Sequence, residues 1–147
     1  MAITSLNSNS STLKLKNTTL DTEHVVTDFI AGDNIVIAPV NPQTSRTYSA
    51  GGVNIQGRVD KDARTITFTV EKFGDTDEFM NEAIYAGQVC VFEGSVKSLY
   101  TKDGEQRTET YSFKGGSITI LPTDTKNNQD GNNEMQIVIE ARVTRDI

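Results

Sequence analysis

Apolar and polar side chains alternate along three segments of the chain, at positions 53–60, 65–71 and 135–144. A period of two places successive side chains on opposite faces, which is the pattern of a strand with one buried and one solvated face. The first two segments are joined by the polar turn 60–63 and are rich in β-branched residues. They are therefore predicted to pair as a β-hairpin, and 135–144 is predicted as one long strand.

The segment after this hairpin has the signals of one short helix. Asp75 is suited to be its N-cap, Glu78 three residues later would complete a capping box, and Gly87 suits a left-handed position after the last turn. These signals predict a helix over about 76–86. Its apolar stripe consists of Phe79, Met80, Ala83 and Ile84. A stripe this narrow predicts a helix that flanks a sheet.

A second hairpin is predicted from residues 89–100 and 106–113, because Asp103-Gly104 between them is a strong turn signal. Seven or more strands with one helix predict a mainly β fold, either a β-sandwich or a strongly bent barrel. The flanking helix would lie on this sheet.

Other parts of the chain are polar and predict little regular structure. Residues 1–19, rich in Ser, Thr and Asn, are predicted to be an N-terminal arm that orders only against another surface. Residues 20–147 are then the single β domain, with long loops at 40–52 and 123–133. Long loops of this kind are commonly functional.

The chain has 147 residues, a formal net charge of −6 and a pI near 4.7. An acidic surface argues against a protein that binds nucleic acid tightly, because that needs clustered Lys and Arg. The single cysteine, Cys90, excludes an intrachain disulfide, and its apolar neighbours predict that it is buried. We find no secretory signal and no membrane-spanning run, so synthesis in the cytoplasm and no membrane partner are expected.

Catalytic chemistry is poorly supported by the residues. No phosphate-binding glycine loop, zinc-binding helix motif, nucleophile elbow or paired-cysteine motif occurs, and His24 is the only histidine. The carboxylates around Asp75 and Glu78 are explained by the helix N-terminus, which favours negative charge. The acidic loop at 124–134 lacks the spacing of a calcium loop. We therefore predict no catalytic, cofactor-binding or metal-binding residue, and a protein that is not an enzyme.

The order of the segments resembles a known family. GDNIVI at 32–37, a long polar loop, and GGVNIQGRVDKDARTITFTVEKFGDTDEFMNEAI at 51–84 resemble the tail tube proteins of long-tailed bacteriophages, especially a compact family from contractile tails. The resemblance extends from about residue 29 to the C-terminus. It implies a β-sandwich subunit whose strands join side by side in a hexameric ring, with rings stacked into a hollow tube.

The same resemblance implies partners and sites. Genomic DNA would slide through a polar, commonly negative lumen without specific binding, and the subunit would contact other copies, the tail sheath, the baseplate and the tail terminator. The protein would belong to the virion tail and assemble in the host cytoplasm. Loop 40–52 matches the position of a ring-stacking loop, with candidates Asn41, Gln43, Thr44, Ser45, Arg46 and Tyr48. Polar strand faces supply the lumen candidates Asn54, Gln56, Arg58, Thr65, Thr67, Thr69, Gln136, Glu140 and Arg142.

Other functions stay open. A different β-sandwich protein of the tail, such as a terminator or connector piece, would stop assembly at one ring. A tube of the type VI secretion kind would share the architecture. A ligand-binding β domain would bind a small molecule and form no polymer, but the chain has no Trp to provide a carbohydrate platform.

Overall fold

The computed structural model describes residues 6–30, 35–129, 131 and 133–146. It contains one helix and ten strands among these residues. In chain order they are β1 (Leu6–Asn17), β2 (Thr22–Val26), β3 (Val36–Pro39), β4 (Thr44–Ser49), β5 (Gly52–Gly57), β6 (Ala63–Glu71), α1 (Asp75–Ile84), β7 (Phe92–Lys102), β8 (Glu105–Ser117), β9 (Thr123–Thr125) and β10 (Glu134–Asp146).

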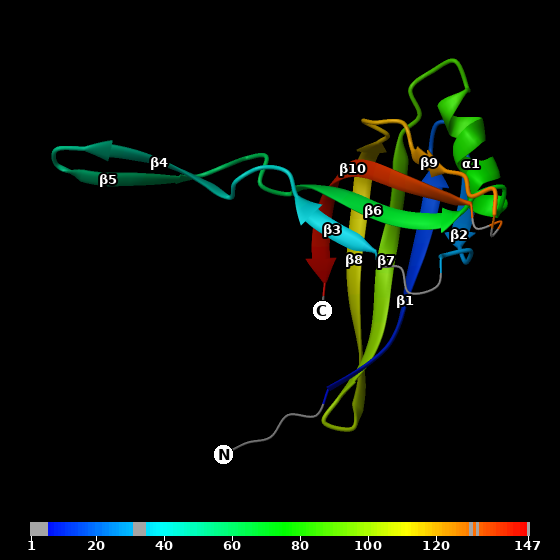
Figure 1. Cartoon of the computed structure of the whole chain (residues 1–147). Coiled ribbons are helices and arrows are strands. Elements are labelled where there is room, and N and C mark those ends of the chain that lie inside the picture. The colour runs from blue at the N-terminus through cyan, green and yellow to red at the C-terminus, as the bar shows by residue number, and fades with distance from the viewer. Residues whose placement is uncertain (1–5, 31–34, 130, 132, 147) are drawn as a thin grey trace.

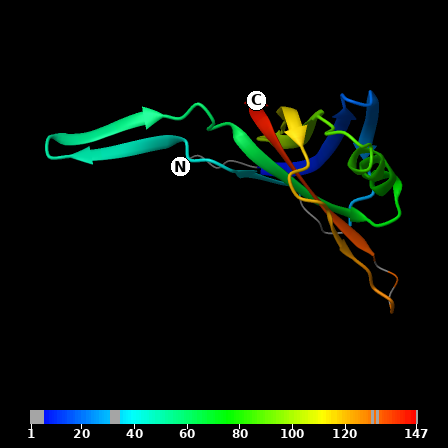
Figure 2. The ribbon, with the colours of Figure 1, turned by 90° about the horizontal axis from the view of Figure 1, so that it is seen from above.

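Eight of the strands form one antiparallel sheet, with neighbour order β2-β1-β7-β8-β10-β6-β3 and β9 paired to β10. The sheet is strongly bent, so that β3, β6 and β10 run across β1, β7 and β8 (Figures 1 and 2). β7 and β1 approach each other closely at Gly94, where a Cβ atom would collide with the Lys14 carbonyl oxygen. The prediction of a mainly β, sandwich-like fold with one short helix is confirmed.

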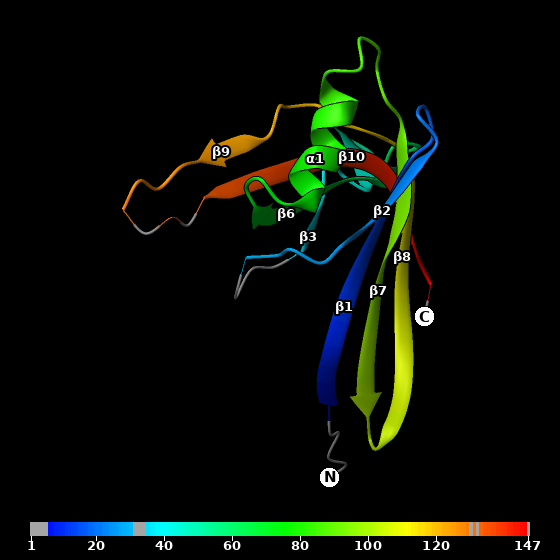
Figure 3. The ribbon, with the colours of Figure 1, turned by 90° about the vertical axis from the view of Figure 1, so that its right-hand side faces the viewer.

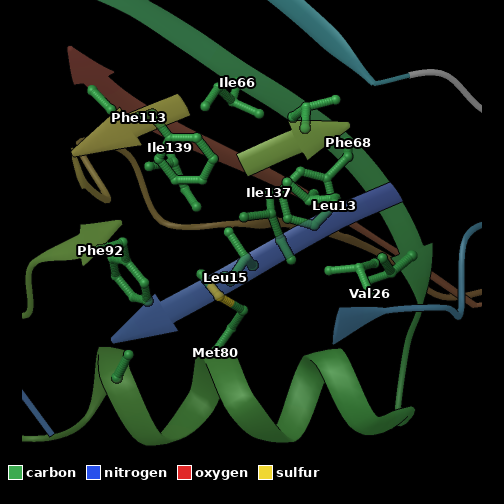
Figure 4. Packing of buried hydrophobic residues seen from close by; sticks show 14 of the residues in the cluster. Leu13, Leu15, Val26, Ile66, Phe68, Met80, Phe92, Phe113, Ile137 and Ile139 are labelled. Carbon is green, nitrogen blue, oxygen red and sulfur yellow. The ribbon is translucent and has the colours of Figure 1, made fainter. Parts of the chain in front are cut away.

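The hydrophobic core lies between the two crossing parts of the sheet (Figure 4). The alternation predicted for β6 and β10 is confirmed, because every second residue of each strand is buried. The predicted hairpin of β7 and β8 is also present, with Asp103 and Gly104 in its turn at φ of 51° and 80°. Fully buried side chains from five elements meet in this core: Leu13, Leu15, Ile66, Phe68, Met80, Phe92, Ile137 and Ile139.

Helix α1 lies beside β2 and β6 at one end of the core (Figure 3). The predicted stripe is confirmed, since Met80 and Ala83 are buried and Phe79 and Ile84 pack against the same cluster. The predicted capping box is wrong. The N-cap residue is Gly74, which offers no side chain, and Asp75 is the first helical residue.

The predicted N-terminal arm is also wrong for the residues that the structure describes. Residues 6–17 form β1, which pairs with β7 from Leu6 to Asn17 and with β2 over residues 13–17. Leu13, Leu15 and Asn17 are buried, so alternate residues of the second half of this strand complete the core. The polar composition did not indicate a strand, because the strand is held by backbone pairing with other strands. Residues 1–5 of the predicted arm lie outside the described residues.

The predicted hairpin between 53–60 and 65–71 does not form. β5 pairs instead with β4, which falls inside the predicted loop 40–52. The face of 53–60 that the sequence predicts to be buried is not in the core, since Val53 and Ile55 of β5 and Val59 after the strand are exposed. The other predicted loop, 123–133, begins with β9, and its residues 130 and 132 lie outside the described residues. Alternation identified the strand β5, but alternation carries no information about its pairing partner.

Candidate functional site

β4 and β5 form a two-stranded ribbon that projects away from the body of the subunit (Figure 1). Every residue of both strands is exposed. A two-residue connection, Ala50-Gly51, joins the strands, and the register pairs Ser49 with Gly52 at its tip. The ribbon contributes nothing to the core, so its position is set only by contacts at its base.

The register makes the ribbon amphipathic. Tyr48 pairs with Val53, and Arg46 pairs with Ile55, so these four side chains share one face. Tyr48, Val53 and Ile55 are 72%, 50% and 56% exposed, and the Arg46 guanidinium lies 5.8 Å from the centroid of the Tyr48 ring. The opposite face is small and polar, with Ser45, Thr47, Ser49, Asn54 and Gln56. An apolar face without a partner marks a contact surface.

Polar contacts fix the base of the ribbon. The Arg58 amide donates to the Gln43 carbonyl at 2.9 Å, and the Asn41 side chain donates to the Asp60 carbonyl at 3.3 Å. The Arg58 guanidinium also donates to both oxygens of the Asp60 carboxylate, at 3.0 Å each. This hydrogen bond lowers the pKa of Asp60 and raises the pKa of Arg58.

Asp62 connects the ribbon base to the sheet. Its carbonyl accepts a hydrogen bond from the Val143 amide at 3.0 Å, and its carboxylate accepts two from Arg142, at 3.0 Å from Nε and 2.9 Å from Nη2. The hydrogen bond from Arg142 lowers the pKa of Asp62, although desolvation works in the other direction. Asp62 therefore holds the ribbon at the C-terminal half of β10.

The six residues predicted for ring stacking all belong to this feature. Thr44, Ser45, Arg46 and Tyr48 lie on β4, and Asn41 and Gln43 lie at the ribbon base. Sequence reasoning missed Val53 and Ile55, which complete the apolar face. The alternation of apolar and polar residues predicts that Val53 and Ile55 are buried. Their pairing with β4 and their exposure show that they face outward.

Six of the nine predicted lumen residues lie on the outer face of β6 and β10: Thr65, Thr67, Thr69, Gln136, Glu140 and Arg142. The register places Thr69 opposite Gln136 and Thr65 opposite Glu140. The other three are separate from this face, since Asn54 and Gln56 lie on the ribbon and Arg58 at its base. The outer face of these two strands therefore contains two thirds of the predicted set, with Val138 opposite Thr67 as an apolar position among them.

A second surface was not predicted. The outer face of β2, β1, β7, β8 and β10 contains a hollow of about 800 Å³. Its basic lining residues are Lys14, Lys16, Lys114 and Arg142. Its acidic lining residues are Glu23, Asp62 and Glu93. These residues come from strands far apart in sequence, so their gathering depends on the sheet topology.

Within the described ranges, no group of three or more His, Cys, Asp or Glu side chains is arranged to hold a metal ion. The helix in this part of the chain is too short and too polar to cross a membrane. Cys90 is buried, as predicted.

No protein-family model matches the sequence, and no curated protein matches it. Among solved structures, the chain is similar to a chain in the cryo-EM structure of the anti-feeding prophage baseplate, six-fold symmetrised. The sequence identity is 7% and the TM-score is 0.53, with 92% of this chain and 91% of that chain covered. The likeness shows a shared fold over nearly the full length of both chains.

Proposed function

We propose that this chain is a structural subunit of a bacteriophage tail or tail-like particle, in which copies join in rings that stack into a tube for genomic DNA. The observation that carries the proposal is the projecting ribbon, whose apolar face is not covered by any residue that the structure describes. An isolated two-stranded ribbon is marginally stable in water. A neighbouring copy that covered this face would stabilise the ribbon and make it part of the contact between subunits.

The energy available from such a contact is substantial. Full burial of a Val or Ile side chain stabilises an assembly by about 1.5–3 kcal/mol, and Tyr adds a large rigid surface with a polar end. Because Tyr48, Val53 and Ile55 lie on one face, a single partner surface would cover all three. A contact between different surfaces of two copies repeats around a ring or along a tube axis.

The shared fold supports the same proposal. The similar chain comes from the six-fold symmetrised structure of the anti-feeding prophage baseplate, so this fold occurs in a baseplate. For the present chain, a ring of six copies is part of the proposal. Sheath, baseplate and terminator proteins are its expected neighbours, and the expected location is the virion tail.

We further propose that the outer face of β6 and β10 lines the lumen. The hydroxyls of Thr65, Thr67 and Thr69 with Gln136 and Glu140 make most of this face polar, Val138 lies among them, and Arg142, at the border with the hollow, is already bound to Asp62. Such a face offers DNA phosphates little unpaired positive charge, so DNA would pass without being held. The net charge of −6 acts in the same direction.

A second candidate is a single ring at the baseplate end of the tube. The observation that favours it is the baseplate origin of the similar chain. The two candidates differ in whether purified subunits stop at one ring or continue into tubes.

Negative-stain electron microscopy of the concentrated purified protein tests the proposal. Rings or tubes with a central hole are expected, and tubes would favour the first candidate. A strictly monomeric species at all concentrations, also in the presence of tail components, would contradict both.

Matched variants of the ribbon test the role of its apolar face. Val53→Ser with Ile55→Ser should abolish tube formation and leave the thermal unfolding of the subunit unchanged. The control, Asn54→Ser with Gln56→Ser, changes the same strand on its polar face and should assemble normally. Equal assembly of both double variants would show that the apolar face is not the contact.

A further inference from the structure

Helix α1 carries an acidic stripe on the side opposite its core contacts. Asp75, Glu78 and Glu82 are exposed and fall at intervals of three and four residues, whereas Met80 and Ala83 are buried on the other side. None of the three carboxylates forms an ion pair with any described residue. Glu82 lies toward the C-terminal end, where the helix dipole disfavours negative charge and no basic residue offsets it. The stripe is thus a negative surface without an internal partner.

The hollow on the outer face of the sheet has the opposite character. Arg142 and Asp62 bind each other there. Three lysines of the hollow form no ion pair with any described residue: Lys14, Lys16 and Lys114. Against them stand two carboxylates, Glu23 and Glu93, so three positive charges minus two negative charges leave one positive charge. This locally positive surface belongs to a chain whose net charge is −6.

The dimensions of the two surfaces agree. A helix of 10 residues is about 15 Å long. The hollow extends over five neighbouring strands, which at the usual strand spacing is about 19 Å. The acidic stripe along a helix of this length can therefore reach across the strands that line the hollow.

The helix of one subunit does not face the hollow of the same subunit. Lys14 and Lys16 alternate with the buried Leu13 and Leu15 along β1, so the hollow lies on the outer face of the sheet. The core-facing side of α1, with Met80, packs in the cluster on the inner face (Figure 4). Contact between stripe and hollow requires a second copy.

We propose that the acidic stripe of α1 in one copy docks into the hollow of the next copy and forms the lateral contact of the ring. The contact joins two different surfaces, so it repeats head to tail around a ring. It rests on the proposed function only in requiring that the subunit assembles with itself. Charge complementarity of this kind fixes the orientation of neighbours and speeds their association.

Charge reversal in two separate variants tests this contact. The hollow variant is Lys14→Glu with Lys114→Glu, and the helix variant is Glu78→Lys with Glu82→Lys. Each variant alone brings like charges together and should raise the concentration for half-maximal ring formation about tenfold or more. An equimolar mixture should restore assembly, because alternating copies then present opposite charges at every contact. The control, Lys61→Glu with Lys126→Glu, makes the same charge change at exposed sites outside the hollow and should assemble normally.

Ring formation would be measured by sedimentation velocity and electron microscopy, with circular dichroism melts to confirm that each variant is folded. If the unmodified protein forms rings and the charge variants form them equally well, the docking proposal is overturned while the proposed function stands. If the unmodified protein never assembles, the proposed function fails first. If the hollow variant instead loses retention of a short DNA duplex and still forms rings, the hollow binds polyanions and the helix is not its occupant.

Discussion

Asp28 caps helix α1 at Thr76 from 48 positions away in the sequence. Its Oδ2 accepts a hydrogen bond from the Thr76 amide at 3.3 Å, and its Oδ1 accepts one from the Thr76 hydroxyl. The same hydroxyl lies 2.7 Å from His24 Nε2, and the Thr76 side chain is fully buried. The remote carboxylate takes the place of the local cap that Gly74 lacks, and it fixes the helix to the segment after β2.

Substitution of Asp28 is therefore expected to destabilise the subunit. Asp28→Ala removes an N-cap interaction worth about 1–2 kcal/mol and leaves a buried hydroxyl without its acceptor. Urea denaturation would measure the loss. Asp75→Ala, at the position that the sequence predicted as the cap, is the matched control and should change stability by less than about 0.5 kcal/mol. A larger effect at Asp75 would contradict the remote cap.

β1 provides a second prediction, because the sequence predicts there an arm that orders only against another surface, whereas the structure places part of β1 in the core. Leu13 is fully buried, so Leu13→Ala should lower the free energy of unfolding by about 2–5 kcal/mol. Thr12→Ala, on the exposed side of the same strand, should have little effect. Thermal unfolding of both variants would decide the point, and equal melting temperatures would show that β1 is not part of the core.

The contact between Asp62 and Arg142 predicts a pH dependence. A carboxyl with a lowered pKa in the folded chain stabilises the fold above its ordinary pKa, and this contribution is lost as the pH falls through the lowered value. The stability advantage of the unmodified protein over Asp62→Asn should be complete at neutral pH and shrink below about pH 4. Denaturation midpoints across this range would measure it. In an Arg142→Gln background the two curves should differ much less, and a pH-independent advantage would refute the assignment.

The ribbon predicts a separation between folding and assembly. Replacement of residues 44–57 by a short Gly-Ser linker removes no core side chain. The melting temperature should therefore stay within about 3 °C of the original, while tube formation is lost. A calorimetric scan and electron micrographs of the same sample provide both measurements. Tubes of normal appearance would exclude the ribbon from stacking.

The sequence correctly predicted the elements whose apolar side chains pack in the core of the same subunit. β6 and β10 alternate because one face of each meets the core, and the stripe of α1 has the same origin. The pattern of β5 has a different origin. Val53 and Ile55 alternate as a buried strand would, but no described part of their own subunit covers them, so the prediction that they are buried is wrong.

Pairing and capping were missed for a related reason, because both depend on residues distant in sequence. The predicted cap at Asp75 followed local rules, whereas the structure uses Asp28. Periodicity likewise did not reveal that the polar segment 6–17 pairs with β7, and its residues 13–17 also with β2. All the stacking candidates lie on the ribbon or at its base. The lumen candidates lie on two surfaces, the outer face of β6 and β10 and the ribbon with its base.

The position of β10 in the sheet has a consequence for biosynthesis. β10 follows every other strand in the chain, yet it lies inside the sheet between β8 and β6. While the chain is still emerging from the ribosome, β6 and β3 therefore cannot pair with the rest of the sheet, because β10, which connects β6 to β8, has not yet been made. The ribbon needs only its own two-residue turn and is free to form early. Completion of this sheet must therefore await β10, which follows the other strands of the described residues.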